Sequence, residues 1–499
     1  MNVIASARLT MSTLSNSRPP DTVEPSAVPA GALSALTALW RNAGLPDAAL
    51  PHLDLRGSAP GLPSSFAVGD AAQASLAAAA LAAAEVRHVR GQGRQQVAVD
   101  RAHALAECAA WFSIDGVTPP TWDRISGLYP CGEDAGARGW VRIHANFAHH
   151  RDGALRLLGC APGPETERAA VTSALRRWSA EAFETAAAEA GLVVAAVRSF
   201  DEWDRHPQSA AIAALPVGLE RLDDDTETPP LAWPALQATM RPLTGLRVLD
   251  LTRILAGPVG CRTLAAHGAD VLMVNSPDLP NVDAIAELSR GKRSAHVDLK
   301  SEAGRATLRT LVGGAHVFVQ GYRPGGLADR GFDPRTLARL RPGIVTASLS
   351  AYGPSGPWAG RRGFDSLVQT ATGFNHAEAA AAGAKTPQAL PIQILDFSAG
   401  FLLAFGVQAA LMRQQREGGS WHVQVSLAGV GRWLRGLGRV ANGFDVPRSE
   451  GVPARFLMSE PSGFGHLVGI RHAADMGETP PLWRLPSMPP GTHRPAWVD

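Results

Sequence analysis

The segment that decides the fold reads LRVLDL at residues 246–251. It is followed by a Gly-Pro turn at residues 257–258, a helical stretch at 262–267 and the segment ADVLMV at 269–274. Two short apolar segments on either side of a helix are typical of a strand–helix–strand unit. The sequence therefore predicts two neighbouring strands joined by one helix in the second half of the chain.

The same alternation of strands and helices continues downstream. A helix-like stretch at 302–312 leads to HVFV (316–319), and a second one at 337–340 leads to IVTASL (344–349). Strands that alternate with helices form βαβ units, which build a largely parallel sheet. We therefore expect the second half to be an α/β domain with a parallel sheet.

The first half contains a partial copy of the second. A shift of 326 residues, which places Asp70 on Asp396, aligns further residues without a gap: Arg87 with Arg413, Gly93 with Gly419, Val97 with Val423 and Val99 with Val425. Each copy has a long Ala/Leu helix, a Gly-containing turn and a short strand of alternating Val. Two Ala-rich helices could be alike through composition alone, but the matching Arg, Gly and Val residues favour a partial tandem duplication.

Between the two copies the sequence predicts a smaller α/β region. A strand at 139–144 is followed by helical stretches at 169–178 and 180–190. The segment 223–230 is acidic and contains prolines, as is typical of a linker.

Composition excludes several classes of function. The 499 residues are 45% hydrophobic and 18% charged with a net charge of +2, as in ordinary globular proteins, and no basic run predicts a nucleic-acid partner. The apolar segment 71–84 is too short and too rich in alanine to cross a membrane, and we expect no other segment to reach the ~20 residues needed. The first thirty residues lack the apolar core and cleavage site of a secretory signal.

Four scattered cysteines without a C-x-x-C pair fit a reducing compartment, so we expect a cytoplasmic protein. His144, His149 and His150 crowd one segment, but their spacing does not repeat on one helical face, and we expect no metal site. No G-x-G-x-x-G motif joins a strand to a helix, so we expect no NAD.

A series of motifs in the second half resembles one known family. The motifs are LTGLRVLDLTR (243–253), AGP (256–258), GADV (268–271), GKRS (291–294), DLK (298–300), RPG (323–325), YG (352–353), GP (356–357) and GFD (363–365). Their types and order are similar to those of class III CoA-transferases of the CaiB/BaiF type, a family that includes the alpha-methylacyl-CoA racemases. The resemblance is strong over 242–430 and weaker over 66–215, which looks like the later part of a family member.

The order of the two parts differs from that of a typical member, in which the nucleotide-fold half precedes the small domain. We therefore hypothesise that the amino-terminal unit supplies in cis the small domain that the second unit lacks. The expected domains are a disordered tail at 1–33, a CoA-transferase-like partial unit with the small domain at 34–222, a linker at 223–240, a Rossmann-like CoA-binding and catalytic unit at 241–440 and a closing segment at 441–499.

The resemblance implies an enzyme that moves CoA between an acyl-CoA thioester and a small carboxylic acid through a carboxylate-bound anhydride. Coenzyme A is then a substrate, and whether the chain pairs with a second copy or a homologous subunit stays open. Two alternatives also stay open. One is an acyl-CoA racemase or isomerase, and the other is a catalytically degenerate CoA-binding subunit.

CoA binding needs βα turns whose backbone amides can approach an anion, together with cationic side chains. The resemblance implies contacts from the turns that follow the strands: Leu255, Ala256, Asp298, Leu299, Lys300, Gly321, Tyr322, Arg323 and Ser350. The alternative for Lys300 and Arg323 is that they are solvated surface charges.

The catalytic carboxylate is harder to assign. The family's nucleophilic Asp lies in the loop after the helix that follows GFD, but the corresponding loop at 373–385 contains no Asp. Glu378 is the only carboxylate in that loop and is therefore the candidate nucleophile, with an exposed residue at a helix start as the alternative.

Related racemases use a His after the glycine of the GFD position together with a later Asp. Here Phe364 occupies the His position, while Asp396 matches the Asp. A single base without its partner argues against two-base racemisation. Asp365 is a third candidate carboxylate, whose alternative role is to cap the helix at 366–371.

Overall fold

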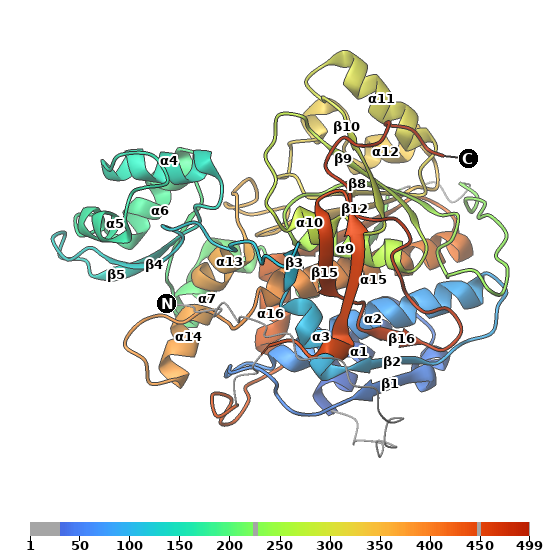
Figure 1. Ribbon diagram of the computed structural model, residues 1–499, viewed down its shortest axis with the longest axis horizontal. Coiled ribbons are helices and arrows are strands. Elements are labelled where there is room, and N and C mark those ends of the chain that lie inside the picture. The colour runs from blue at the N-terminus through green and yellow to red at the C-terminus, as the bar shows by residue number, and fades with distance from the viewer. Residues whose placement is uncertain (1–29, 223–227, 447–450, 499) are drawn as a thin grey trace.

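The apolar segments of the second half form the middle of a seven-stranded sheet (Figure 1). The computed structural model describes residues 30–222, 228–446 and 451–498. In spatial order the strands are β10 (Lys292–His296), β9 (Asp270–Asn275), β8 (Arg247–Leu251), β11 (Val317–Gln320), β12 (Val345–Ser350), β13 (Trp421–Ser426) and β7 (Val217–Arg221). The first six are parallel, and β7 is antiparallel to β13.

The chain reverses its direction of travel across this sheet between β8 and β11. It runs from β8 outward to β9 and β10, returns to β11 on the other side of β8, and continues to β12 and β13. This is the doubly wound order, so the predicted Rossmann-like parallel sheet is confirmed. In sheets of this kind ligands bind outside the carboxyl ends of the strands, next to the reversal.

Helices cover both faces of the sheet. On one face lie α9 (Ala256–Ala266) and α15 (Ile394–Glu417), and on the other lie α11 (Glu302–Gly313) and α12 (Pro334–Leu340). The other helices of the second half are α10 (Ile285–Leu288), α13 (Asp365–Ala371), α14 (Phe374–Ala381) and α16 (Leu427–Gly436). Along β8, Val248 packs in the core that contains α9 and α15, whereas Leu249 and Leu251 pack in the core that contains α11. Successive strand residues point to opposite faces, which is why the buried strand is apolar almost throughout.

The duplicated segment forms the same three elements in both copies. In the first half these elements are α2 (Val68–Val89), β2 (Val97–Asp100) and α3 (Arg101–Cys108). The shift of 326 residues carries the first residue of α2 onto that of α15, and the first residue of α3 onto that of α16.

The helix caps match as well. Asp100 caps α3 by accepting a hydrogen bond from the backbone N–H of His103, and Ser426 caps α16 by accepting one from Gly429, at the same shift. Capping side chains at matched positions preserve the start of a helix. Helix, strand and following helix therefore agree in both copies, which supports the predicted partial duplication.

The two copied helices pack against each other in the centre of the molecule. Gln408 on α15 donates a hydrogen bond to the carbonyl oxygen of Ala79 on α2 over 3.0 Å, and Ser75 and Ser398 are 3.3 Å apart. Nearly every residue of α2 is buried. The alanine-rich sequence of α2 therefore serves close helix packing.

A smaller α/β region projects from one side, at the left of Figure 1. Its sheet contains β4 (Gly127–Cys131), β5 (Gly139–Ile143) and β6 (Val194–Ala196), covered by α4 (Ala148–Leu158), α5 (Arg168–Leu175) and α6 (Ala180–Glu189). These elements share a hydrophobic core of their own. Two short helices, α7 (Phe200–Arg205) and α8 (Pro207–Ala210), then lead the chain back to β7 in the large sheet.

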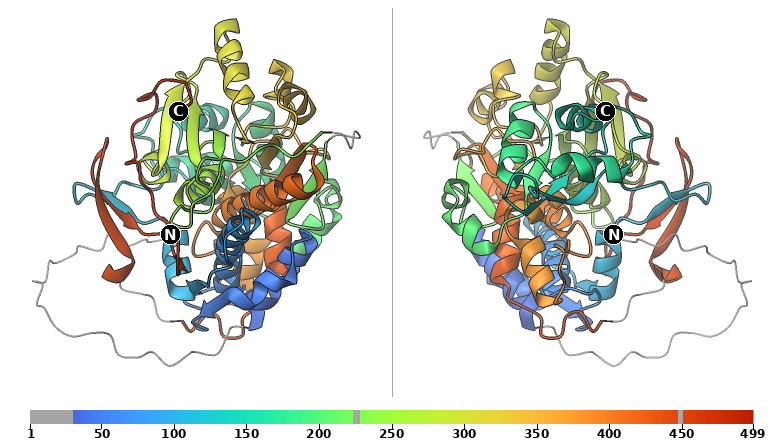
Figure 2. Two further views of the ribbon diagram at one scale, coloured as in Figure 1. Left: turned by 90° about the vertical axis from the view of Figure 1, so that its right-hand side faces the viewer. Right: turned by 90° about the vertical axis from the view of Figure 1, so that its left-hand side faces the viewer.

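The carboxyl-terminal segment returns to the first half, as Figure 2 also shows. Its strands β14 (Leu457–Ser462) and β15 (Gly465–Ile470) form a sheet with β3 (Phe112–Ile114). Strand β16 (Ala474–Met476) joins β1 (Leu53–Arg56) and β2 in another sheet. The remaining helix, α1 (Ala30–Asn42), packs on α2.

A buried ionic contact ties these parts together. Glu107 on α3 accepts a hydrogen bond from Arg262 on α9 over 3.0 Å, and another from the backbone N–H of Ala473 over 2.7 Å. Both charged side chains are almost fully buried. The segments 66–215 and 242–430 are therefore joined by a buried interface and are not detached from each other.

Two expectations need correction. The predicted tail at 1–33 lies outside the described residues up to residue 29, but residues 30–33 belong to α1, so its boundary was placed too late. We also expected no segment long enough to cross a membrane, yet α15 has 24 residues, and its most apolar stretch has a mean hydropathy of 1.7. That stretch is wholly buried inside the molecule, because α15 is the central core helix.

Candidate active site

The residues expected to bind CoA lie together at one edge of the large sheet. Leu255 follows β8, the turn 321–323 follows β11, and Ser350 ends β12. The segment 298–300 follows β10. All of them thus lie at the carboxyl ends of parallel strands, on both sides of the reversal between β8 and β11.

The turn after β8 has an unusual backbone. Ile254 adopts a φ of 78°, a left-handed conformation that is costly for a β-branched residue. Strain of this kind persists only where the surroundings enforce it, and it is often found at ligand-binding sites. Leu255 then occupies the cap position before α9 and provides no side-chain cap.

A buried ion pair holds the start of this turn. Lys292 Nζ lies 2.9 Å from Asp250 Oδ2, and both side chains are fully buried. The other oxygen of Asp250 accepts hydrogen bonds from the backbone N–H and the hydroxyl of Thr252, over 2.9 and 2.5 Å. Lys292 also donates to the carbonyl oxygen of Pro258 over 3.0 Å, so one lysine fixes both ends of the turn.

The cationic candidates differ in their surroundings. Lys300 is exposed and pairs with Asp278 over 2.7 Å, while Asp298 accepts a hydrogen bond from the backbone N–H of Lys300. Arg323 is exposed, and within the described ranges its side chain makes no hydrogen bond or ion pair with another residue. Burial raises the pKa of the neighbouring Tyr322.

Two glycines bring this turn close to the candidate carboxylates. A Cβ atom on Gly400 of α15 would lie 2.5 Å from the carbonyl oxygen of Ala256, and one on Gly260 of α9 would lie 2.8 Å from that of Gly400. Only glycine allows the backbones of α9 and α15 to approach so closely. Because Asp396 precedes Gly400 by about one helical turn, it lies near the start of α9.

Asp365 is completely buried and binds the start of another helix. Its carboxylate accepts a hydrogen bond from the backbone N–H of Asp396 over 2.9 Å, another from the backbone of Leu395 and a third from the Gln369 side chain. Its expected alternative role, as a cap of its own helix, was wrong. Phe364 holds the cap position of α13 without a side-chain bond, while Asp365 caps α15. Burial raises the pKa of Asp365 to about 6.

Asp396 lies in the first turn of α15 with a small part of its side chain exposed. Within the described part of the chain, no hydrogen bond to its carboxyl oxygens is found. Burial and the negative charge of Asp365 together hold the pKa of Asp396 well above its ordinary value. Two interacting carboxyls in one site favour a state in which at least one is protonated.

Glu378 lies apart from this pair, on α14. Its oxygens accept hydrogen bonds from the hydroxyl of Ser64 over 2.6 Å and from the backbone N–H of Ser65 over 3.1 Å. The side chain is buried, so the expected alternative of an exposed helix-start residue was wrong. Burial raises the pKa of Glu378. These contacts anchor the segment before α2 and leave little room for attack on a thioester.

Sequence reasoning missed the side chains that the small domain contributes. Arg142 on β5 is buried and lies close enough to Asp365 for their charges to interact. The ring of His144 stacks on Phe364 with 4.0 Å between ring centres, and its Nδ1 is buried without a partner in the described residues. Burial lowers the pKa of His144 to about 3, so its imidazole is neutral.

A second group of cations lines the same junction. His150 on α4 accepts a hydrogen bond from Arg362 over 3.2 Å, and its pKa is lowered to about 3 by burial and by neighbouring cations that include Arg362 and Arg253. The positive charges of Arg362 and Arg323 also lie close enough to interact. Among the described residues, no group of three or more His, Cys, Asp or Glu is placed to hold a metal ion. The junction is thus rich in positive charge, which suits an anionic ligand.

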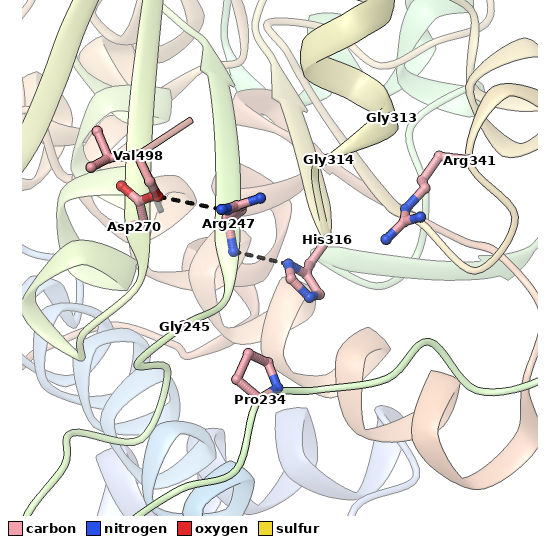
Figure 3. A pocket seen from close by; sticks show the side chains of 9 residues that line it. All are labelled: Pro234, Gly245, Arg247, Asp270, Gly313, Gly314, His316, Arg341 and Val498. Carbon is pink, nitrogen blue, oxygen red and sulfur yellow. Dashed lines mark hydrogen bonds between the residues drawn. The ribbon is translucent and has the colours of Figure 1, made fainter. Parts of the chain in front are cut away.

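A cavity of about 620 Å³ lies elsewhere (Figure 3). It is lined by Pro234, Gly245, Arg247, Asp270, Gly313, Gly314, His316, Arg341 and Val498. Three of these residues begin or directly precede the strands β8, β9 and β11. The cavity therefore lies at the amino ends of the strands, opposite the edge that carries the candidate site.

Comparisons with known proteins point to one family. Residues 243–441 match the model of CoA-transferase family III. An acyl-CoA transferase from Gibberella moniliformis is 30% identical over 382 residues, which cover 69% of this chain and 66% of that protein. A succinate–glutarate CoA-transferase from Agrobacterium fabrum is 33% identical, over 38% of this chain and 52% of that protein.

The crystal structure of a CaiB/BaiF family protein from Brucella suis is 27% identical and has a TM-score of 0.35, over 46% of this chain and 65% of that one. The matches span from 52% to 66% of the lengths of these three proteins. The motifs of the second half, the doubly wound sheet and the sequence relatives agree on one assignment. The chain belongs to CoA-transferase family III.

Proposed function

We propose that this chain is a CoA-transferase, which moves CoA between an acyl-CoA thioester and a small carboxylic acid. The observation that carries the proposal is the buried pair Asp365 and Asp396 at the start of α15, close to the turn that begins α9. The edge of the sheet suits a nucleotide, and the pair supplies a carboxylate near it. Names of relatives that include acyl-CoA and succinate–glutarate CoA-transferases support the same reaction class.

Asp396 is the better candidate nucleophile of the pair. The oxygens of Asp365 are engaged with the start of α15, whereas those of the buried Asp396 accept no hydrogen bond from the described residues and its side chain is 8% exposed. In the proposed reaction, ionised Asp396 attacks the thioester carbonyl carbon, the C–S bond breaks and CoA leaves as a thiolate. The thiolate then attacks the Asp396 carbonyl and releases the donor acid, after which the acceptor acid reverses these steps.

The raised pKa values of the pair fit this role. A carboxylate that is less stable in its charged form is more basic and therefore more nucleophilic once it is ionised. The pKa of Asp365 is raised to about 6, so Asp365 is largely ionised at neutral pH, while Asp396, whose pKa is raised well above its ordinary value, has to lose its proton before it attacks. Glu378, the nucleophile that the loop sequence predicts, is held by Ser64 and Ser65 and is the weaker candidate.

We further propose that a single chain contains the whole site. Arg142 and His144 of the small domain approach the helix that carries Asp365, and the first half is joined to the second through β7, which pairs with β13, and α2, which packs on α15. This arrangement supports the hypothesis that the first half supplies the small domain in cis.

The test is incubation of the purified chain with a panel of short acyl-CoAs and isotopically labelled acids, followed by trapping with hydroxylamine and mass spectrometry. We expect label in the acyl-CoA pool and a hydroxamate on Asp396. A hydroxamate on Glu378 would move the nucleophile but keep the reaction. CoA binding without label transfer or adduct would refute the transferase and favour a degenerate binding subunit.

A second candidate function is proton exchange at the carbon next to the thioester carbonyl. The observation that favours it is the neutral imidazole of His144, which stacks on Phe364 and thus brings a base to the position where the sequence lacks one. Asp396, held protonated, would be the matching acid. Solvent deuterium at the acyl α-carbon, without CoA transfer, would identify this reaction.

A further inference from the structure

Arg142 is a buried cation without a matching partner. It lies on β5 and is only 7% exposed, and its Nε is buried without a hydrogen-bond partner among the described residues. Its guanidinium lies over the ring of Trp122, 5.5 Å from the ring centre. Within the described chain, the side chain of Arg142 makes no hydrogen bond or ion pair. A buried charge is costly unless it is paired, so this position calls for an anion.

The nearest carboxylate does not meet this need. Asp365 interacts with the charge of Arg142, but its oxygens already accept hydrogen bonds from Asp396, Leu395 and Gln369. Arg142 therefore keeps donors free for a ligand. An arginine fork matches a carboxylate with two parallel hydrogen bonds.

The surroundings place this ligand at the reacting end of the site. Arg142 on β5 and His144, which directly follows this strand, both contact the ring of Trp122, so their side chains lie on the same side. His144 stacks on Phe364, the residue just before Asp365. On this side the small domain thus presents a cation and a neutral imidazole toward the acids of α13 and α15.

We infer that Arg142 binds the carboxylate of the free acid that receives CoA, and holds it next to Asp396. This inference rests on the proposed function for its role, but not for the binding itself. The cations Arg253, Arg323 and Arg362 lie near the turns of the large sheet, where the phosphates of CoA are expected. Arg142 instead binds the acceptor acid, so the acid must carry a negative charge in order to bind.

The inference is tested with propionate and the uncharged propionamide, titrated into the full-length protein without CoA and followed by calorimetry. We expect propionate to bind at least about tenfold more tightly than propionamide, since a charged hydrogen bond is lost with the amide. Arg142→Gln should weaken propionate binding by about tenfold or more, and Arg142→Lys should weaken it less. The matched control is Arg176→Gln, because Arg176 is an exposed arginine of the same domain, paired with Asp134.

Equal binding of propionate and propionamide to the wild-type protein would overturn the inference even if the Arg142 variants failed to fold. Unchanged propionate affinity in a folded Arg142→Gln protein would overturn it too, and loss of CoA binding alone would assign Arg142 to the phosphates. Because these titrations involve no turnover, a protein that binds propionate through Arg142 but transfers no CoA would refute only the proposed function.

Discussion

The backbone N–H of Asp396 donates a hydrogen bond to the carboxylate of Asp365 over 2.9 Å, so that one acid caps the helix that carries the other. The free N–H groups at a helix start stabilise a negative charge, which favours ionised Asp365. Ionised Asp365 in turn disfavours ionisation of Asp396. Asp365 is thus the anion that caps α15, and Asp396 is the acid that is available for reaction.

Asp396→Asn should abolish CoA transfer while the protein stays folded. An amide cannot form the anhydride, and it cannot donate or accept the proton as a carboxyl does, so we expect a fall in kcat of about 100-fold or more. The measurement is steady-state transfer to a labelled acid, with CoA affinity determined in parallel. Full activity of a folded Asp396→Asn protein would eliminate Asp396 as the nucleophile.

The carboxyl pair should also make stability depend on pH. Burial raises the pKa of Asp365 from 3.8 to about 6, and that of Asp396 is raised as well, so the folded state keeps protons that the unfolded state loses. The resulting stabilisation is present at low pH and is lost as pH rises through the folded pKa values.

We therefore expect Asp396→Asn to be more stable than the wild type at pH 8, by an amount that shrinks toward pH 4. Urea unfolding of both proteins across this range measures the difference. Titrations elsewhere in the molecule cancel in the comparison. A difference that stays constant with pH would show that Asp396 titrates normally in the folded protein.

Much of the large sheet could be predicted from sequence because local patterns specify it. The strand expected at 246–251 is β8 at Arg247–Leu251, and the helix expected at 302–312 is α11. Both signals depend on apolar residues within one short window. The repeat was equally visible, because its strand valines and turn glycine were matched without a gap.

The contacts between residues of the site could not be predicted, because these residues come from distant parts of the chain. Asp365 caps a helix that starts at Ile394, and Arg142 reaches it from a strand of the first half. No local pattern encodes which helix start a carboxylate will meet. The helix α15 was predicted from the repeat, but it is apolar on all sides because it lies in the centre of the core, so no periodicity shows which face meets which neighbour.

Glu378→Gln should retain most of the transferase activity. The glutamine oxygen can still accept the hydrogen bonds from Ser64 and Ser65, so the segment before α2 stays in place. Glu378→Ala removes the acceptor and leaves buried donors unsatisfied, which should lower the free energy of unfolding by about 1–3 kcal/mol. A loss of transfer in a folded Glu378→Gln protein, with unchanged stability, would restore Glu378 as the nucleophile.

Lys292→Met should destabilise the protein strongly, because it leaves the fully buried Asp250 without its counter-ion. Breaking a buried pair from one side costs about 3–5 kcal/mol, whereas the double variant Asp250→Asn with Lys292→Met should recover part of this loss. Urea unfolding measures both.

Lys300→Met is the matched control, because Lys300 pairs with Asp278 on the surface and should contribute no more than about 1 kcal/mol. CoA affinity should fall with Lys292→Met, since Lys292 also holds Pro258 at the end of the strained turn. Equal effects of the two lysine substitutions on stability would show that the Asp250 pair does not hold this turn.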